Sequence, residues 1–118
     1  MRKTYEDEIV KLTRVLSDQV RVRILLILRA GRIETYSAPP CTDYPMAICP
    51  TDLQLELGKI SSSKLSYHLK LLKEEGFIQE HREGKRIYYY LQPTRFDQLI
   101  KVLEPFKSNS KESRISDS

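Results

Sequence analysis

The stretch SSSKLSYHLKLLKEEGF, residues 61–77, is the most informative segment of this chain, because it has the pattern of one amphipathic helix. Serine is favoured where a helix begins, and Gly76 is typical of the position just past a helix end. On a helical wheel of about 100° per residue, Leu65, Leu69 and Leu72 share one narrow sector. Hydroxyl groups, a phenol and an amine lie opposite. The pattern predicts a helix that buries its leucines and exposes a polar, partly cationic face.

Three earlier segments are also predicted as helices. Residues 4–16 carry apolar side chains at helical spacing. A second and more apolar helix follows, with Ser17 as the expected N-cap and Gly31 just past its end. A short helix is expected to start with Thr51 as its N-cap. The region before residue 61 is therefore mostly helical.

A proline-rich segment interrupts this pattern at about residues 32–50, and we name it the insert. Four of the six prolines of the chain fall between Pro39 and Pro50. Proline breaks helices, so the insert is predicted to be mostly loop. A loop of this length inside a compact domain is usually functional or mobile.

Beyond Gly76 the apolar period changes from helical to alternating, as in a strand. The segments FIQEH and RIYYYLQ flank REGK, which centres on Gly84 and predicts a hairpin. A last helix follows from Pro93. The chain is thus predicted to be mainly α with a small two-stranded antiparallel β-wing, a winged helix-turn-helix domain over residues 1–107. Residues 108–118 have almost nothing to bury and are expected to form a disordered tail.

Three motifs, in this order, resemble those of ArsR/SmtB-type bacterial repressors. They are LSDQVRVRILLIL (16–28), SSSKLSYHLKLLKEEGFI (61–78) and REGKRIYYYL (82–91). The resemblance covers roughly residues 8–106 apart from the insert. It implies a homodimeric, DNA-binding transcriptional repressor, in which the first and last helices build the dimer and an inducer or metal releases the operator.

The polar face of the helix and the basic wing are the predicted contacts with double-stranded DNA. Polar side chains of a helix in the major groove read base edges, whereas cations mainly contact phosphates. The predicted DNA-binding residues are Ser62, Ser63, Lys64, Ser66, Tyr67, His68, Lys70, Arg82, Lys85 and Arg86. The alternative for the polar residues is that they are simply solvated. His68 lies at the border of the leucine sector, which leaves open a structural role or a phosphate contact.

The first and last helices carry more apolar side chains than a core of this size can use. An exposed apolar stripe usually marks an interface. We therefore expect a homodimer formed through these two helices. A two-fold dimer places its recognition helices about 34 Å apart and predicts an inverted-repeat operator.

No metal site and no cofactor are predicted. Cys49 matches the first cysteine of a Cys-x-Cys-Asp-Leu metalloid pattern of the family, but Thr51 replaces the second, and one thiolate is a poor metalloid site. The last helix contains no histidine, which argues against a four-ligand zinc site there. Cys41 and Cys49 are either incidental buried thiols, a redox pair or ligands of a thiophilic ion. The effector is not identified.

The composition sets broad limits. A net charge of +4 and a pI of about 9.1 permit an anionic partner without requiring one. The longest apolar run is too short to span a membrane, and the N-terminal residues are too polar for a secretory signal, so a cytoplasmic location is expected. Common catalytic motifs such as a glycine-rich phosphate loop are missing, so an enzyme is not expected. The alternative function is a winged-helix protein–protein interaction module without sequence-specific DNA binding.

Overall fold

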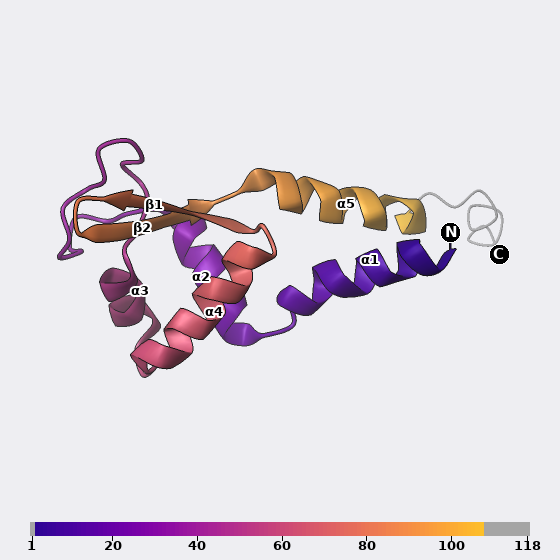
Figure 1. Ribbon diagram of the computed structural model, residues 1–118, viewed down its shortest axis with the longest axis horizontal. Helices are drawn as coiled ribbons and strands as arrows, with labels where there is room; N and C mark the ends of the chain where they lie inside the picture. The colour runs from indigo at the N-terminus through magenta and orange to yellow at the C-terminus, as the bar shows by residue number, and fades with distance from the viewer. Residues whose placement is uncertain (1, 108–118) are drawn as a thin grey trace.

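The computed structural model describes residues 2–107, and within them the chain forms five helices and one two-stranded antiparallel sheet (Figure 1). The elements are α1 (Arg2–Val15), α2 (Gln19–Ala30), α3 (Pro50–Leu57), α4 (Ser62–Glu74), β1 (Ile78–Glu83), β2 (Arg86–Leu91) and α5 (Pro93–Lys107). This order confirms the predicted winged helix-turn-helix fold. The expected tail, residues 108–118, lies outside the described residues. No helix in the described range is both long and apolar enough to cross a membrane.

Helix α2 begins one residue later than the sequence predicted. Its N-cap is Asp18, whose Oδ1 accepts hydrogen bonds from the amides of Val20 at 2.8 Å and Arg21 at 3.1 Å. The hydroxyl of Ser17 instead donates to the carbonyl oxygen of Arg14 at 2.7 Å, at the end of α1. The prediction of Ser17 as N-cap was therefore wrong, because this serine completes the preceding turn.

Helix α3 begins earlier than predicted. Its first residue is Pro50, and its N-cap is Cys49, whose side chain makes no capping hydrogen bond. Proline at the first helical position has a φ already suited to a helix and lacks an N–H that would be unpaired there. The prediction of Thr51 as N-cap was therefore wrong, and the insert ends by starting the helix.

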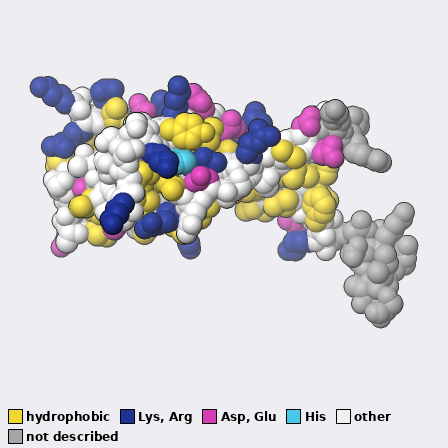
Figure 2. All heavy atoms as spheres, turned by 90° about the horizontal axis from the view of Figure 1, so that it is seen from below, with side chains coloured by type: hydrophobic (Ala, Val, Ile, Leu, Met, Phe, Trp, Pro, Cys, Tyr) yellow, Lys and Arg dark blue, Asp and Glu magenta, His cyan; other side chains and the backbone are white. Residues whose placement is uncertain are grey.

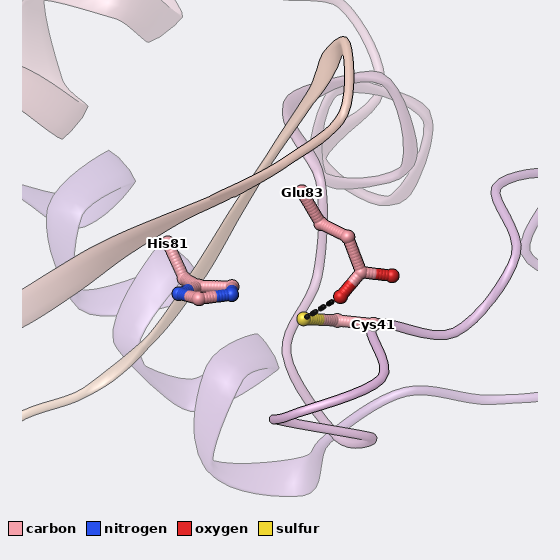
Figure 3. Close-up of side chains that lie close together, drawn as sticks. All are labelled: Cys41, His81 and Glu83. Carbon is pink, nitrogen blue, oxygen red and sulfur yellow. Dashed lines mark hydrogen bonds between the residues drawn. The ribbon is translucent and has the colours of Figure 1, made fainter.

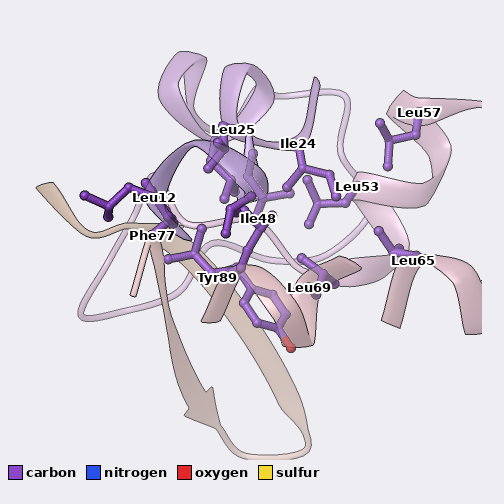
Figure 4. Close-up of a cluster of buried hydrophobic side chains, with 14 residues drawn as sticks. Leu12, Ile24, Leu25, Ile48, Leu53, Leu57, Leu65, Leu69, Phe77 and Tyr89 are labelled. Carbon is purple, nitrogen blue, oxygen red and sulfur yellow. The ribbon is translucent and has the colours of Figure 1, made fainter. Parts of the chain in front are cut away.

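The main core lies between the helices and one face of the β-hairpin (Figure 4). Burying one leucine side chain fully stabilises the fold by about 1.5–3 kcal/mol. Leu53 of α3 and Leu72 of α4 are completely buried, as the sequence spacing predicted. The buried members of the main core are Leu12, Val15, Ile24, Leu25, Leu28, Ile48, Leu53, Leu57, Leu65, Leu69, Leu72, Phe77, Ile78 and Tyr89.

The insert covers the other face of the hairpin. There Tyr88 is buried in a second cluster, whose members are Ala38, Cys41, Ala47, Cys49 and Tyr88, with Tyr90 packed against it. Backbone hydrogen bonds in both directions join Ile48 to Tyr89, at 3.0 and 2.8 Å, so the insert pairs with the hairpin at one point. The Tyr88 hydroxyl donates to the Pro39 carbonyl oxygen at 2.8 Å. The insert is thus a packed part of the domain.

Helices α1 and α5 lie side by side and extend away from the rest of the domain, and we name this pair the arm (Figure 1). The Tyr5 hydroxyl links them by donating to the Val102 carbonyl oxygen at 2.6 Å. Large apolar side chains remain exposed along the arm; they are Tyr5, Val10, Ile100, Leu103 and Phe106. The predicted surplus of apolar surface is therefore present in the single chain.

Candidate nucleic-acid interface

Helix α4 has the orientation predicted from the sequence. Its N-cap is Ser61, whose hydroxyl oxygen accepts a hydrogen bond from the Lys64 amide at 3.1 Å. The leucines of α4 face the main core, and the Tyr67 ring on the opposite side is 60% exposed. The exposed residues on this side are Ser62, Ser63, Lys64, Ser66, Tyr67 and Lys70, which we name the recognition face. In Figure 2, seen from the side on which α4 lies in Figure 1, basic side chains spread over this part of the molecule.

The turn between α3 and α4 is fixed by one side chain of α3. The amide nitrogen of Gln54 donates to the Ile60 carbonyl oxygen at 2.8 Å, and its Oε1 lies 3.4 Å from the Ser62 hydroxyl. These contacts hold the start of α4 against α3. The recognition face is therefore carried by a helix whose N-terminus is held in place.

His68 does not lie on the recognition face. Its side chain is 4% exposed, and its Nδ1 lies 3.1 Å from Nη1 of Arg21, a buried residue of α2. A guanidinium has only donors, so Nδ1 accepts and the ring proton is on Nε2. This position does not support the predicted DNA contact of His68, because the leucine side of α4 extends far enough to bury the ring. The structural role left open by the sequence is the one this geometry supports.

The electrostatics around His68 agree with a neutral ring. Burial lowers the pKa of His68 below its ordinary value of 6.5, and the charges of Arg21 and Lys64 act in the same direction. Asp18 opposes them. A histidine that accepts a hydrogen bond from arginine also loses that bond when it is protonated. Folding therefore favours the neutral form.

The predicted wing residues are all exposed. Arg82, Lys85 and Arg86 surround the turn at Gly84, between β1 and β2. Gly84 has φ +63°, a left-handed conformation that glycine adopts readily. The tight turn thus places three cations at the tip of the hairpin.

Both cysteines lie inside the second cluster, and neither forms a disulfide. The Cys49 thiol donates to Oδ2 of Asp52 at 3.4 Å, and the Cys41 thiol donates to Oε1 of Glu83 at 3.5 Å. The fold thus gives the two thiols different carboxylate partners. It brings neither onto the recognition face.

The sequence analysis missed two features of this region. Asp52 is 2% exposed and accepts hydrogen bonds from the amides of Ser37 and Ala38 at 2.9 and 3.2 Å, so it anchors the insert. Among the described residues, Cys41, His81 and Glu83 form one group with ligand atoms close enough to share a metal ion. No short-range pattern predicts this group, because Cys41 is about forty residues from His81 and Glu83.

The chain is similar to known resistance regulators. It is 31% identical over 85 residues to the arsenical resistance operon repressor of Escherichia coli, a match that covers 71% of this chain and 59% of that protein. It is 34% identical over 79 residues to an arsenic resistance transcriptional regulator of Pseudomonas putida, covering 66% and 49%. A match to a homologue of the cadmium resistance transcriptional regulatory protein from Staphylococcus aureus has 28% identity over 93 residues and covers 79% and 64%. The chain therefore spans less than two thirds of the length of these relatives. No protein-family model matches it.

Solved structures share the fold. An ArsR-like transcriptional regulator from Rhodococcus has a TM-score of 0.66 at 19% identity, with 95% of this chain and 90% of that chain covered. The homodimeric winged helix-turn-helix DNA-binding domain of a possible ArsR-family regulator from Mycobacterium bovis has a TM-score of 0.61 at 19% identity, with 90% and 83% covered. The chain therefore has the winged helix-turn-helix fold, and its sequence is similar to those of ArsR-type resistance regulators.

Proposed function

We propose that this chain is a homodimeric, sequence-specific DNA-binding transcriptional repressor. The observation that carries the proposal is the recognition face of α4, on which Ser66 and Tyr67 are exposed while the leucines of the same helix are buried. A helix with such a face fits the major groove, where hydroxyl groups can bond to base edges. The names of its relatives, a repressor and transcriptional regulators, support the same function. The proposal includes no catalytic activity.

The cations near this face have the second role in the proposal. Lys64 and Lys70 flank the hydroxyl groups on α4, and three further cations surround the tip of the hairpin. Phosphate contacts position a protein on the duplex without reading its sequence. We therefore assign Lys64, Lys70, Arg82, Lys85 and Arg86 to the DNA backbone.

The arm is the proposed dimer interface. Its apolar side chains are exposed in the single chain, and at its base lies an apolar groove of about 370 Å³. The groove is lined by Leu16, Val22, Leu25, Leu26, Arg29, Leu91 and Phe96. Leu26 is 54% exposed there, an arrangement that a second copy would cover. A two-fold dimer would then bind an inverted-repeat operator, with half-sites about 34 Å apart.

A salt titration tests the proposal against the alternative of a protein-binding module. The operator is first selected from a random duplex pool. A protein that neutralises six to ten phosphates loses about 10³–10⁵ in affinity between roughly 50 and 200 mM salt. We expect a loss of this order. Absent or salt-insensitive binding to every duplex would favour the protein-binding alternative.

Substitutions on α4 test base reading. We expect Ser66→Ala and Tyr67→Ala to weaken operator binding by about 1–3 kcal/mol and to weaken non-specific binding less. Lys70→Ala is the matched control on the same face, because loss of a phosphate contact lowers both affinities similarly and reduces the salt slope by about one. Equal losses on both duplexes for Ser66→Ala and Tyr67→Ala would show that neither side chain reads bases.

Release by an effector or by a redox change is part of the proposal. The candidate sensors are the thiols of Cys41 and Cys49, and the proposed location of the protein is the cytoplasm. We expect an oxidant to change operator affinity if these thiols sense it. A double Cys41→Ser, Cys49→Ser variant that responds to oxidant like the wild type would remove them from the proposal.

A further inference from the structure

We propose that Cys41, His81 and Glu83 bind a divalent transition-metal ion of the zinc type where the insert meets the wing. Figure 3 shows the three side chains directed toward one another, one from the insert and two from β1. Their ligand atoms all lie within 4.8 Å of one another, and Sγ of Cys41 is 3.5 Å from Oε1 of Glu83. Zinc bonds of about 2.0–2.3 Å place tetrahedral ligand atoms about 3–4 Å apart. Small side-chain movements would therefore close the site.

The donor set selects the class of ion. One thiolate, one imidazole and one carboxylate match the sulfur, nitrogen and oxygen ligands of Zn²⁺. Magnesium and calcium prefer oxygen ligands alone, and a soft metalloid needs two or three thiolates. A thiolate and a carboxylate together also balance the charge of a divalent cation. The site thus differs in chemistry from an arsenic site.

Neighbouring groups already orient two of the three ligands. The Thr42 amide donates to Oε1 of Glu83 at 2.9 Å and to Oε2 at 3.2 Å, and the Thr42 hydroxyl donates to Oε2 at 2.8 Å. The two contacts of Oε2 can therefore hold the carboxylate while Oε1 exchanges its own contacts for a bond to the metal. Oδ2 of Asp43 lies 3.3 Å from Nε2 of His81. Metal-binding histidines usually have such a carboxylate partner on the other ring nitrogen. Water can complete the coordination.

The burial of the group defines how the ion enters. The Cys41 side chain is 1% exposed, whereas the side chain of His81 is 29% exposed. The ion therefore reaches the site from the side of His81. On binding, the thiol of Cys41 releases its proton to solvent and Sγ bonds to the metal in place of its hydrogen bond to Glu83, so binding weakens as the pH falls.

The alternative is that the same contacts only join the insert to the wing by hydrogen bonds. Neither position suggested by the family resemblance, the segment at Cys49 and the last helix, is involved. The two readings differ in one measurable property, the binding of a metal ion by the folded protein.

Titration of the metal-free full chain with Co²⁺ under reducing conditions tests the site. We expect one ion per chain, an absorption band from thiolate-to-cobalt charge transfer, and displacement of the cobalt by Zn²⁺. Cys41→Ser should abolish the band, and His81→Gln and Glu83→Gln should each weaken binding at least tenfold. Cys49→Ser is the matched control, because Cys49 is a buried cysteine of the same cluster and should leave the band unchanged.

Two results would overturn the site. One is a folded wild type that binds neither Co²⁺ nor Zn²⁺, and the other is a band that survives Cys41→Ser and disappears in Cys49→Ser. Circular dichroism checks that each variant is folded. His81→Gln changes a partly exposed position, so it tests the site even if a serine at buried position 41 prevents folding.

A link from this site to DNA rests on the proposed function, and it is measured separately. Glu83 is next to the turn that carries the basic tip, so we expect Zn²⁺ to change operator affinity in the wild type and not in His81→Gln. Metal binding without any duplex binding would leave the site standing and remove the repressor. Duplex binding without metal binding would support the repressor and rule out the metal site.

Discussion

On one face of the β-hairpin, Ile78 and Tyr89 pack among leucines supplied by regular helices, whereas on the other face Tyr88 packs against the insert, which contains no helix or strand before Pro50. The main core is built from side chains repeated at helical spacing. The second cluster is smaller and is built from alanine, cysteine and tyrosine. Both faces are buried, but the insert has no hydrogen-bonded backbone ladder of its own.

The difference shows how an irregular segment can be held in place. Buried backbone groups need hydrogen-bond partners. In the main core the helices supply them internally, whereas in the insert Asp52 accepts from two backbone amides and Glu83 accepts from the amide of Thr42. The helices and strands therefore depend on apolar packing, whereas the insert also depends on carboxylates that hold its backbone at residues 37, 38 and 42.

The largest loss of stability is expected from Phe77→Ala, which removes a buried side chain from the main core. Phe77 is completely buried and its ring meets that of Phe96 edge to face, with centroids 5.0 Å apart. Removing a buried phenyl group costs about 3–5 kcal/mol of unfolding free energy. Denaturant unfolding measures the loss. Leu55→Ala, at a position 70% exposed, should change the stability by no more than about 0.5 kcal/mol.

Asp52→Asn should have a smaller effect, confined to the insert. A hydrogen bond to a charged group contributes about 1.5–3 kcal/mol, and the amide can no longer accept at both oxygens. Hydrogen exchange should show faster opening of residues 37 and 38, with little change in α4. Glu56→Gln, an exposed carboxylate on the same helix, is the control. Loss of exchange protection throughout α4 would mean that the two regions unfold as one unit.

On acidification, the main core and the insert should lose stability at different pH values. Burial would raise the pKa of Asp52, but hydrogen bonds from the Ser37 and Ala38 amides outweigh it and hold the pKa below 3.8. The stability from Asp52 is thus complete above the unfolded value of 3.8 and is lost as pH falls through the lower folded value. The neutral His68 ring contributes above its unfolded pKa of 6.5 and loses that contribution as pH falls below it.

Unfolding free energies measured from about pH 8 to about pH 3 check this assignment. His68→Gln should flatten the upper part of the profile, and Asp52→Asn should flatten the lower part. Identical profiles for wild type and His68→Gln between about pH 5 and 6.5 would contradict a neutral, buried His68.

The smallest effect is expected from Tyr88→Phe, in the second cluster. It removes the 2.8 Å hydrogen bond to the Pro39 carbonyl oxygen and keeps the buried ring. We expect a loss of about 0.5–1.5 kcal/mol, measured by denaturant unfolding. Tyr67→Phe, whose ring is exposed on α4, should leave the stability unchanged. A Tyr88→Phe loss as large as that of Phe77→Ala would contradict the expectation that this change in the second cluster costs less stability than the change in the main core.

Local patterns predicted the parts of the fold that repeat. The helical spacing of Leu65, Leu69 and Leu72 correctly gave the buried side of α4, and Gly84 correctly marked the turn of the hairpin. The caps were less certain from sequence, because Ser17 and Asp18 are adjacent and both residue types are good N-caps. Only the position of the last turn of α1 decides between them.

Contacts between distant residues could not be read from spacing. Arg21 and His68 are 47 positions apart, and Cys41 and Glu83 are 42 apart. The alternation of the hairpin put Tyr88 and Tyr90 on one face, but it could not say that the insert covers that face. The insert lacks the periodicity that predicts a buried side, so its packing follows only from the three-dimensional fold.

The guanidinium of Arg21 joins parts of the molecule that would have different tasks in a repressor. Its Nε donates to the Val15 carbonyl oxygen at 2.7 Å, at the end of α1, while Nη1 reaches His68 in the middle of α4. A rotation of the arm relative to α4 would break a buried, charge-assisted hydrogen bond of Arg21, which contributes about 1.5–3 kcal/mol. Arg21 thereby links the end of α1 to the middle of α4. In a two-fold dimer formed through the arm, this link would fix the orientation of each α4 relative to the dimer interface and so to the DNA.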